Sequence, residues 1–97
     1  MIVGVCRITL RLPESGSLKD KRQLVRSVTK RLRNKFNVAV AEVGGNDTWQ
    51  IAVLGITCVS NDARHAREVL DHAVAFVQQQ RLDAELLESE IDVNQAF

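Results

Sequence analysis

The sequence is poor in the residues that mark specialised folds or compartments. One proline and five glycines among 97 residues exclude collagen-like and low-complexity chains. No apolar run approaches the ~20 residues of a membrane-spanning helix, and the N-terminus lacks the basic and apolar regions of a signal peptide. The two cysteines, Cys6 and Cys58, lie in apolar runs without a CxxC partner. We therefore expect buried thiols, rather than a disulfide or a metal pair, in a cytoplasmic protein that binds no membrane.

Residues suited to catalysis are also scarce. His65 and His72 stand seven positions apart, about 10.5 Å along a helix, which is too far for them to share a metal ion. No third ligand stands at metal spacing, no base lies near either cysteine in the sequence, and the phosphate-loop motif GxxxxGK(S/T) is absent. These gaps favour a protein that is not an enzyme and carries no metal or cofactor.

Hydrophobic patterns predict six elements of secondary structure. Alternating apolar and polar residues predict four strands, at residues 2–12, 38–43, 48–60 and 84–93. The apolar side of the last strand should consist of Leu87, Ser89, Ile91 and Val93. Helical spacing predicts one helix from the N-cap Ser17 to a left-handed stop at Asn37, and a second helix capped by Ser60 or Asn61 and ending in "QQQR", 78–81. The turn "GGND", residues 44–47, joins the two middle strands as a hairpin.

The order of these elements is β-α-β-β-α-β, within a single domain over residues 1–97. Right-handed crossovers then favour an α+β fold of the ferredoxin-like kind. This is a two-layer sandwich in which a four-stranded antiparallel sheet carries both helices on one face. The even positions of the first and third strands, which include Cys6 and Cys58, should form the side that faces the helices.

The most unusual feature is the charge of the first predicted helix, "SLKDKRQLVRSVTKRLRNKF", residues 17–36. It holds eight of the thirteen Lys and Arg residues and one acid, Asp20, for a net charge of +7 (8 − 1), although the whole chain carries only +1. Residues 81–97 balance it with Arg81 against five acids, a net of −4 (1 − 5). Like charges at i,i+4 cost a few tenths of a kcal/mol each, so the row calls for an explanation outside the helix.

On a helical wheel, five of these cations share one flank of the helix: Lys19, Arg22, Arg26, Lys30 and Arg33. Lys21 falls near the apolar stripe, in the first turn, where its stem can extend to solvent. A one-sided row of cations suits the phosphates of a nucleic acid, and Lys21 is included as a less certain contact. A solvated face that binds nothing is an equally good interpretation, and an acidic protein or membrane surface is a weaker one.

The sheet face turned away from the helices is expected to be unusually apolar. It should present Val3, Val5, Trp49, Ile51, Val53 and Val59, beside Arg7, Thr9 and Arg11. We expect a second copy to cover it, forming a homodimer. If the last strand neighbours the first, as ferredoxin-like order requires, Arg7 and Arg11 should pair with its carboxylates rather than bind a ligand.

A smaller polar and aromatic cluster follows the "GGND" turn, formed by Asp47, Trp49 and Gln50. The simpler interpretation is a capped turn with a partly buried tryptophan. The alternative is a contact surface in which the indole ring stacks on a ligand.

Four segments in this order, "SLKDKRQLVRS", "FNVAVAEV", "DTWQ" and "AVLGITCVSND", resemble the YlxP-like family of small bacterial proteins over nearly the whole chain. The resemblance implies a ferredoxin-like fold, no catalytic residues, and association with RNA or ribosomal particles, because members are often encoded beside translation and ribosome-maturation factors. Its basic positions correspond to Lys19, Lys21, Arg22 and Arg26. We therefore expect a non-enzymatic protein that binds RNA phosphates through its first helix; the alternative is an interaction or dimerisation module without a nucleic-acid role.

Overall fold

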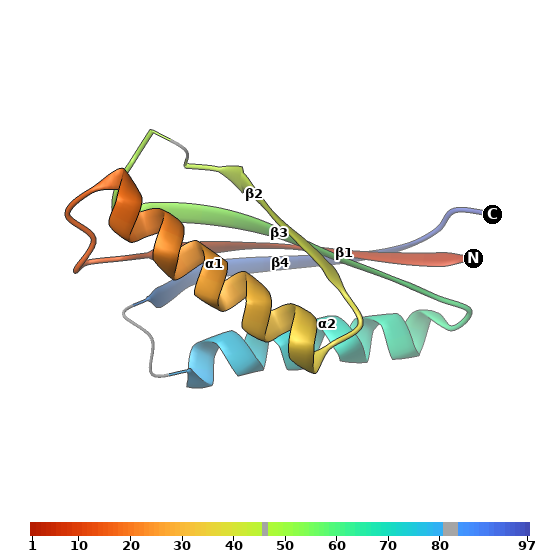
Figure 1. Ribbon diagram of the computed structural model, residues 1–97. Coiled ribbons are helices and arrows are strands. Elements are labelled where there is room, and N and C mark those ends of the chain that lie inside the picture. The colour runs from red at the N-terminus through yellow and green to blue at the C-terminus, as the bar shows by residue number, and fades with distance from the viewer. Residues whose placement is uncertain (46, 81–83) are drawn as a thin grey trace.

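The computed structural model describes residues 1–45, 47–80 and 84–97. Two layers are evident, a sheet and a pair of helices on one of its faces (Figure 1). In chain order the elements are β1 (Ile2–Arg11), α1 (Leu18–Lys35), β2 (Ala39–Gly44), β3 (Ile51–Ser60), α2 (Ala63–Gln79) and β4 (Glu85–Gln95). The predicted β-α-β-β-α-β order is confirmed. Asn46 of the predicted turn, and Arg81 of the predicted helix end, lie outside the described residues.

The sheet has the order β2-β3-β1-β4, with every neighbouring pair antiparallel. This is the ferredoxin-like arrangement, in which the first and third strands are central and the second and fourth form the edges. In β1 and β3 the register places even residues opposite even residues, so Ile8 lies across from Leu54 and Cys6 across from Ile56. The predicted fold and strand order are therefore confirmed.

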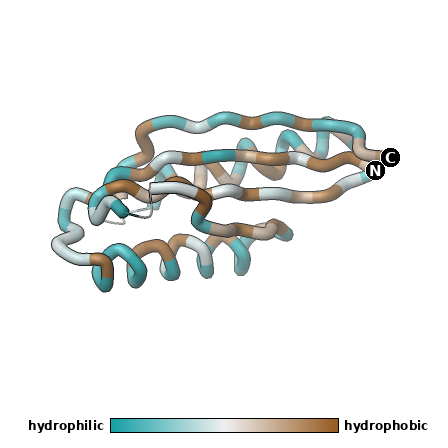
Figure 2. The backbone as a smooth tube through the Cα atoms, turned by 90° about the horizontal axis from the view of Figure 1, so that it is seen from above, coloured by the Kyte–Doolittle hydropathy of each residue, from teal (hydrophilic) through white to brown (hydrophobic). Residues whose placement is uncertain are grey.

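One face of the sheet and the two helices enclose the core. Its fully buried members include Ile8 and Leu10 of β1, Leu54 of β3, Leu32 of α1 and Leu70 of α2. Burying such aliphatic side chains contributes roughly 1.5–3 kcal/mol each. The helices also meet at an edge-to-face pair of Phe36 and Phe76, whose ring centroids are 5.7 Å apart. Hydropathy alternates along the strands accordingly, with apolar and hydrophilic residues following one another (Figure 2). Among the described residues no helix has the length and apolarity to cross a bilayer.

The helix ends agree with the sequence at two of four predicted positions, since α2 ends at Gln79, with Gln80 as its C-cap, within the predicted "QQQR". Ser17 caps α1 as expected, because its hydroxyl accepts a hydrogen bond from the Asp20 amide at 3.1 Å. The left-handed stop at Asn37 is wrong: no described residue other than glycine has a positive φ, and α1 ends on an extended Phe36. The cap of α2 is Asp62 rather than Ser60 or Asn61, since the Asp62 carboxylate accepts from the Arg64 amide at 3.0 Å.

Strand β4 contains an irregularity that the alternation did not predict. Between Thr9 and Leu10 of β1 the register shifts by one residue, so that Glu88 faces Thr9 but Leu86 faces Leu10. The extra residue is Leu87, which is 49% exposed instead of lying on the core side. The bulge reverses the parity of the residues before it, and therefore turns Leu86 toward the core and Glu85 toward Arg11.

Candidate nucleic-acid interface

The predicted row of cations lies on an exposed flank of α1. Its five members are Lys19, Arg22, Arg26, Lys30 and Arg33, and all five are exposed. Over the described residues, none of them lies within ion-pair distance of a carboxylate. From Lys19 to Arg33 the row extends about 21 Å at 1.5 Å per residue. We call these five residues the cationic row.

The contacts of α1 show which way the cationic row faces. Arg31, on the opposite flank, donates a hydrogen bond to Gln80 at the end of α2 at 2.8 Å, and the Lys35 ammonium lies 5.1 Å from the centre of the Phe76 ring in α2. Within the row, Arg33 instead donates from Nη2 to the backbone oxygen of Val40 in β2, at 2.6 Å. The row therefore runs along the side of α1 that faces away from α2, above the edge strand β2.

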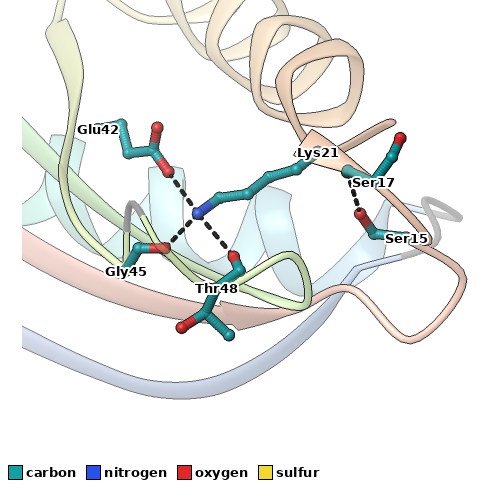
Figure 3. A network of polar contacts seen from close by, with 6 residues as sticks. All are labelled: Ser15, Ser17, Lys21, Glu42, Gly45 and Thr48. Carbon is teal, nitrogen blue, oxygen red and sulfur yellow. Dashed lines mark hydrogen bonds and ion pairs between the residues drawn. The ribbon is translucent and has the colours of Figure 1, made fainter. Parts of the chain in front are cut away.

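Lys21 does not belong to this surface. Its side chain is only 3% exposed, and its ammonium bonds the backbone oxygens of Gly45 and, at 2.9 Å, Thr48. The carboxylate of Glu42 completes the set at 3.1 Å (Figure 3). The expectation that Lys21 extends to solvent as a phosphate contact is wrong, because three acceptors beneath the helix satisfy the ammonium without water. Lys21 instead fastens the first turns of α1 to the chain between β2 and β3.

Sequence reasoning missed Glu42 as the partner of Lys21, although a signal existed. Glu42 is the single acid of β2 and falls on the same side of that strand as the buried Val40. Lys21 likewise falls near the apolar stripe of its helix. Lys21 and Glu42 thus lie on the core-facing sides of two elements that pack together. A cation and an anion in such positions are expected to pair with each other.

The residue after β2 must be glycine for this arrangement to form. Gly45 has φ of +74°, and a Cβ built there would lie 2.9 Å from the backbone oxygen of Ile51. Its carbonyl accepts both the Lys21 ammonium and, at 3.1 Å, the Thr48 amide. A glycine with positive φ thus lies in the predicted turn, although β2 extends to Gly44 and β3 begins at Ile51 instead of Thr48.

The structure separates the members of the Asp47, Trp49 and Gln50 cluster into two roles. Gln50 is an anchor: its amide donates to the oxygen of Pro13 at 3.3 Å, and its own backbone oxygen accepts from Leu12 at 2.8 Å. Trp49 is 53% exposed, and Asp47 is exposed as well. These two side chains are therefore accessible to a ligand.

On the sheet face away from the helices, both arginines pair with acids of β4 as predicted. The expected partners were Glu88, Glu90 and Asp92, but Arg11 pairs with Glu85, which the bulge brings to this face. Arg7 donates to Glu90 at 2.7 Å, and Arg11 lies 3.4 Å from Glu85. The hydrogen bond and charge of Glu90 raise the pKa of Arg7 above its ordinary value. Both arginines are more than half exposed, so solvent screens each pair and its contribution to stability is small.

The remainder of this face is apolar and incompletely covered. Val5, Val43 and Val59 are 42%, 58% and 66% exposed. A shallow depression of about 300 Å³ lies over Gly55, where the central strand lacks a side chain, and Val5, Val43 and Thr57 contribute to its walls. The expected exposed apolar surface is therefore present on the part of this face that is formed by β2, β3 and the start of β1.

The cysteines and the histidines differ in burial. Cys6 and Cys58 are free and buried, and burial raises both thiol pKa values, with Cys6 at about 11. His65 and His72 are exposed on α2. In the described ranges, no group of three or more His, Cys, Asp or Glu residues is arranged to hold a metal ion.

Comparison with known proteins gives a family without an assigned activity. Residues 3–91 match the family described as "Protein of unknown function (DUF503)". Over 76 residues, covering 78% of this chain and 83% of the relative, the sequence is 34% identical to "Uncharacterized protein YlxP" of Bacillus subtilis (strain 168). The resemblance to the YlxP-like family, inferred from four segments of the sequence, is thereby confirmed.

Proposed function

The chain belongs to the DUF503 family, and on that premise we propose that it is a non-enzymatic, cytoplasmic protein that binds the phosphate backbone of structured RNA, free or in ribosomal particles. The observation that carries the proposal is the cationic row. Five exposed cations follow one another along α1 without a carboxylate partner among the described residues. Their mutual repulsion is unfavourable in the free protein, and bound phosphates would remove it.

The distribution of charge over the sheet supports binding in one orientation. The cationic row lies above the edge strand β2, whereas the acids Glu85, Glu88, Glu90 and Asp92 lie on β4 at the opposite edge. With a net charge of only +1, the protein as a whole attracts RNA weakly. Attraction by one edge and repulsion by the other would place RNA along α1 and away from β4.

Within the row the members contribute unequally. Within the part of the chain that the structure describes, the side chains of Lys19, Arg22, Arg26 and Lys30 form no hydrogen bond or ion pair, whereas Arg33 already bonds the Val40 oxygen. A guanidinium has five N–H donors, so Arg33 retains donors for a phosphate. Four to five contacts at ~0.9 released counterions each predict that log K falls with log salt at a slope of about −4.

The experiment is a salt titration of binding to a duplex RNA hairpin, followed by fluorescence anisotropy. Changing Arg22→Gln together with Arg26→Gln should make the slope less steep by about two and weaken binding on any sequence. The matched control is Arg64→Gln with Arg67→Gln, which removes two exposed arginines from α2 and should change the slope far less. An unchanged slope in the first variant would show that the row only keeps the helix solvated.

A second candidate function, homodimerisation, is favoured by the apolar depression over Gly55. We infer that a second copy covers this face, because Arg7 and Arg11 are already paired and stacking would therefore bury no uncompensated guanidinium. Val5→Glu places a carboxylate beside the depression, while Gln78→Glu makes the same charge change on exposed α2. Sedimentation should show a dimer for the parent and for Gln78→Glu, and a monomer for Val5→Glu; a parent monomer at high concentration would exclude the dimer.

A further inference from the structure

The chain between β2 and β3 carries an exposed aromatic ring between two anchored residues. Trp49 is the single tryptophan of the protein and is 53% exposed. Burial of a large aromatic side chain is strongly favourable in free energy, because it removes much apolar surface from water. An exposed tryptophan on an anchored loop is therefore a candidate contact for a partner.

The backbone on both sides of Trp49 is fastened. The Thr48 oxygen accepts from the buried Lys21 ammonium at 2.9 Å, and the Thr48 amide donates to Gly45 at 3.1 Å. On the other side, the Gln50 oxygen accepts from Leu12 at 2.8 Å and its side chain donates to Pro13. The backbone that carries the exposed ring is thus anchored on both sides, by bonds to separate parts of the fold, which limits the backbone entropy lost when the ring binds a partner.

The surroundings of the ring show what kind of ligand would fit. A shallow depression of about 400 Å³ is lined by Asp47, Thr48, Trp49 and Gln50, which combine one aromatic face with carboxylate, hydroxyl and amide groups. An apolar segment of a partner protein would bind best in a depression lined by apolar side chains. An unpaired nucleobase instead stacks on an aromatic ring and forms hydrogen bonds through its edges. The bonds of Lys21 also place this depression at the end of α1 where the cationic row begins, with Lys19 and Arg22 in its first turns.

We propose that Trp49 is a stacking platform for an unpaired nucleobase, so that the preferred RNA has a single-stranded segment next to the phosphates bound by α1. The proposal rests on the proposed RNA-binding function and narrows its substrate class. Asp47 adds a preference within that class, because a carboxylate only accepts hydrogen bonds. Adenine offers it an exocyclic amino group with two N–H donors, whereas the edge of uracil offers one ring N–H between two carbonyl oxygens that the carboxylate repels.

Quenching of Trp49 reports on binding in the parent, because no other tryptophan contributes fluorescence. Isothermal titration calorimetry gives the affinity of all three proteins, since the two variants lack this ring. Oligoadenylate, oligouridylate and inorganic polyphosphate, which has phosphates but no bases, are titrated into the parent, Trp49→Leu and Trp49→Phe. Oligoadenylate should quench the tryptophan of the parent. Trp49→Leu should bind it about 5- to 150-fold more weakly, the range that loss of one stacked base produces, while Trp49→Phe retains most of the affinity.

The outcomes distinguish the stacking platform from the proposed binding of RNA phosphates by the cationic row. Polyphosphate should bind all three proteins alike, through the cationic row. Equal affinity of the parent and Trp49→Leu for oligoadenylate, with polyphosphate still bound, overturns the stacking platform alone and leaves the ring to a protein partner. Absence of binding to every probe overturns both proposals. Thermal melting of the two variants, whose altered side chain is half exposed, checks that each is folded.

Discussion

Helix α1 and strand β4 hold most of the charge of this protein, and they carry it in opposite ways. On β4 the acids face β1, whose register is fixed by the sheet, so Glu90 meets Arg7 and Glu85 meets Arg11. On α1 the neighbours three and four positions away have the same sign. Strand β2 beneath it supplies one acid, Glu42, which is engaged by Lys21.

The difference shows that a charged side chain on a helix or strand is available to an external partner only where the fold supplies no opposite charge close to it. Two lysines in the same turn of α1 illustrate the distinction. Lys21 points to the sheet and meets three acceptors, whereas Lys19, two positions earlier, is exposed. Both have the same chemistry and nearly the same place in the sequence, so the direction of the side chain decides between a structural and a binding role.

The largest effect should come from replacing the buried member of this pair. Lys21→Met leaves the Glu42 carboxylate and the oxygens of Gly45 and Thr48 without their shared donor. We expect a loss of about 2–4 kcal/mol in the free energy of unfolding, below the usual figure for a fully buried pair because Glu42 is 29% exposed. Urea unfolding measures it. Lys19→Met, the matched control, should change stability by less than about 0.5 kcal/mol, and equal losses in the two variants would contradict the distinction.

The second effect concerns the thiol of Cys6, on the core side of β1, which burial keeps in its neutral form. Burial and the nearby charge of Asp71 raise the pKa of Cys6 from 9.0 to about 11. Because the folded thiol keeps its proton after the unfolded thiol has lost it, stability is full below pH 9 and falls as pH rises toward 11. The loss should reach about 2–3 kcal/mol at the upper end.

Chemical unfolding at several pH values tests this prediction, with Cys6→Ala as the control that removes the group. The difference in unfolding free energy between the parent and Cys6→Ala should be constant below pH 9 and should shrink above it. A difference that does not depend on pH would contradict the raised pKa. Thiol reagents should also react with Cys6 and Cys58 only after denaturation, because both are buried.

A smaller effect measures the paired charges of β4. A double-mutant cycle of Arg7→Gln and Glu90→Gln should give a small favourable coupling free energy, since both side chains are more than half exposed. The coupling should decline as salt is added. A cycle of Arg22→Gln with Glu90→Gln is the control, because Arg22 forms no ion pair with Glu90 or with any other described carboxylate, and it should show no coupling.

The smallest effect measures the unpaired charges of α1. Removing like-charge neighbours by Arg22→Gln with Arg26→Gln should stabilise the free protein by a few tenths of a kcal/mol at low salt and by less at high salt. Thermal unfolding at two salt concentrations measures the change. Destabilisation at both concentrations would mean that the two arginines make favourable contacts within the protein, which would weaken the case for an outside partner.

The parts of this fold that follow from local patterns were predictable. Alternation in β1 and β3 placed Ile8, Leu54 and Cys6 on the core side, and helical spacing placed Leu32 there. The element order then left few topologies for an antiparallel sheet, so the neighbouring position of β4 and β1 could also be anticipated.

The errors occur where a contact distant in the sequence overrides the local pattern. Lys21 was expected to reach solvent because its helix alone offers it no acceptor, and Glu42 and Thr48 are more than twenty positions away. Leu86 and Leu87 exchanged sides because a bulge is fixed by pairing with Leu10, not by alternation within β4. The cationic row was placed correctly, since helical geometry alone determines that its members share a flank.

The hydrogen bond from Arg33 to the Val40 oxygen affects how this protein resists aggregation. Strand β2 ends the sheet, and the free backbone groups of an edge strand can recruit a strand from another molecule. The guanidinium occupies one of these groups and also holds a positive charge over the edge, which opposes the approach of a second β2. Arg33 thus protects the edge as well as belonging to the cationic row. A variant lacking it would combine weaker ligand binding with a greater tendency to add strands, and only Lys19, Arg22, Arg26 and Lys30 report on binding alone.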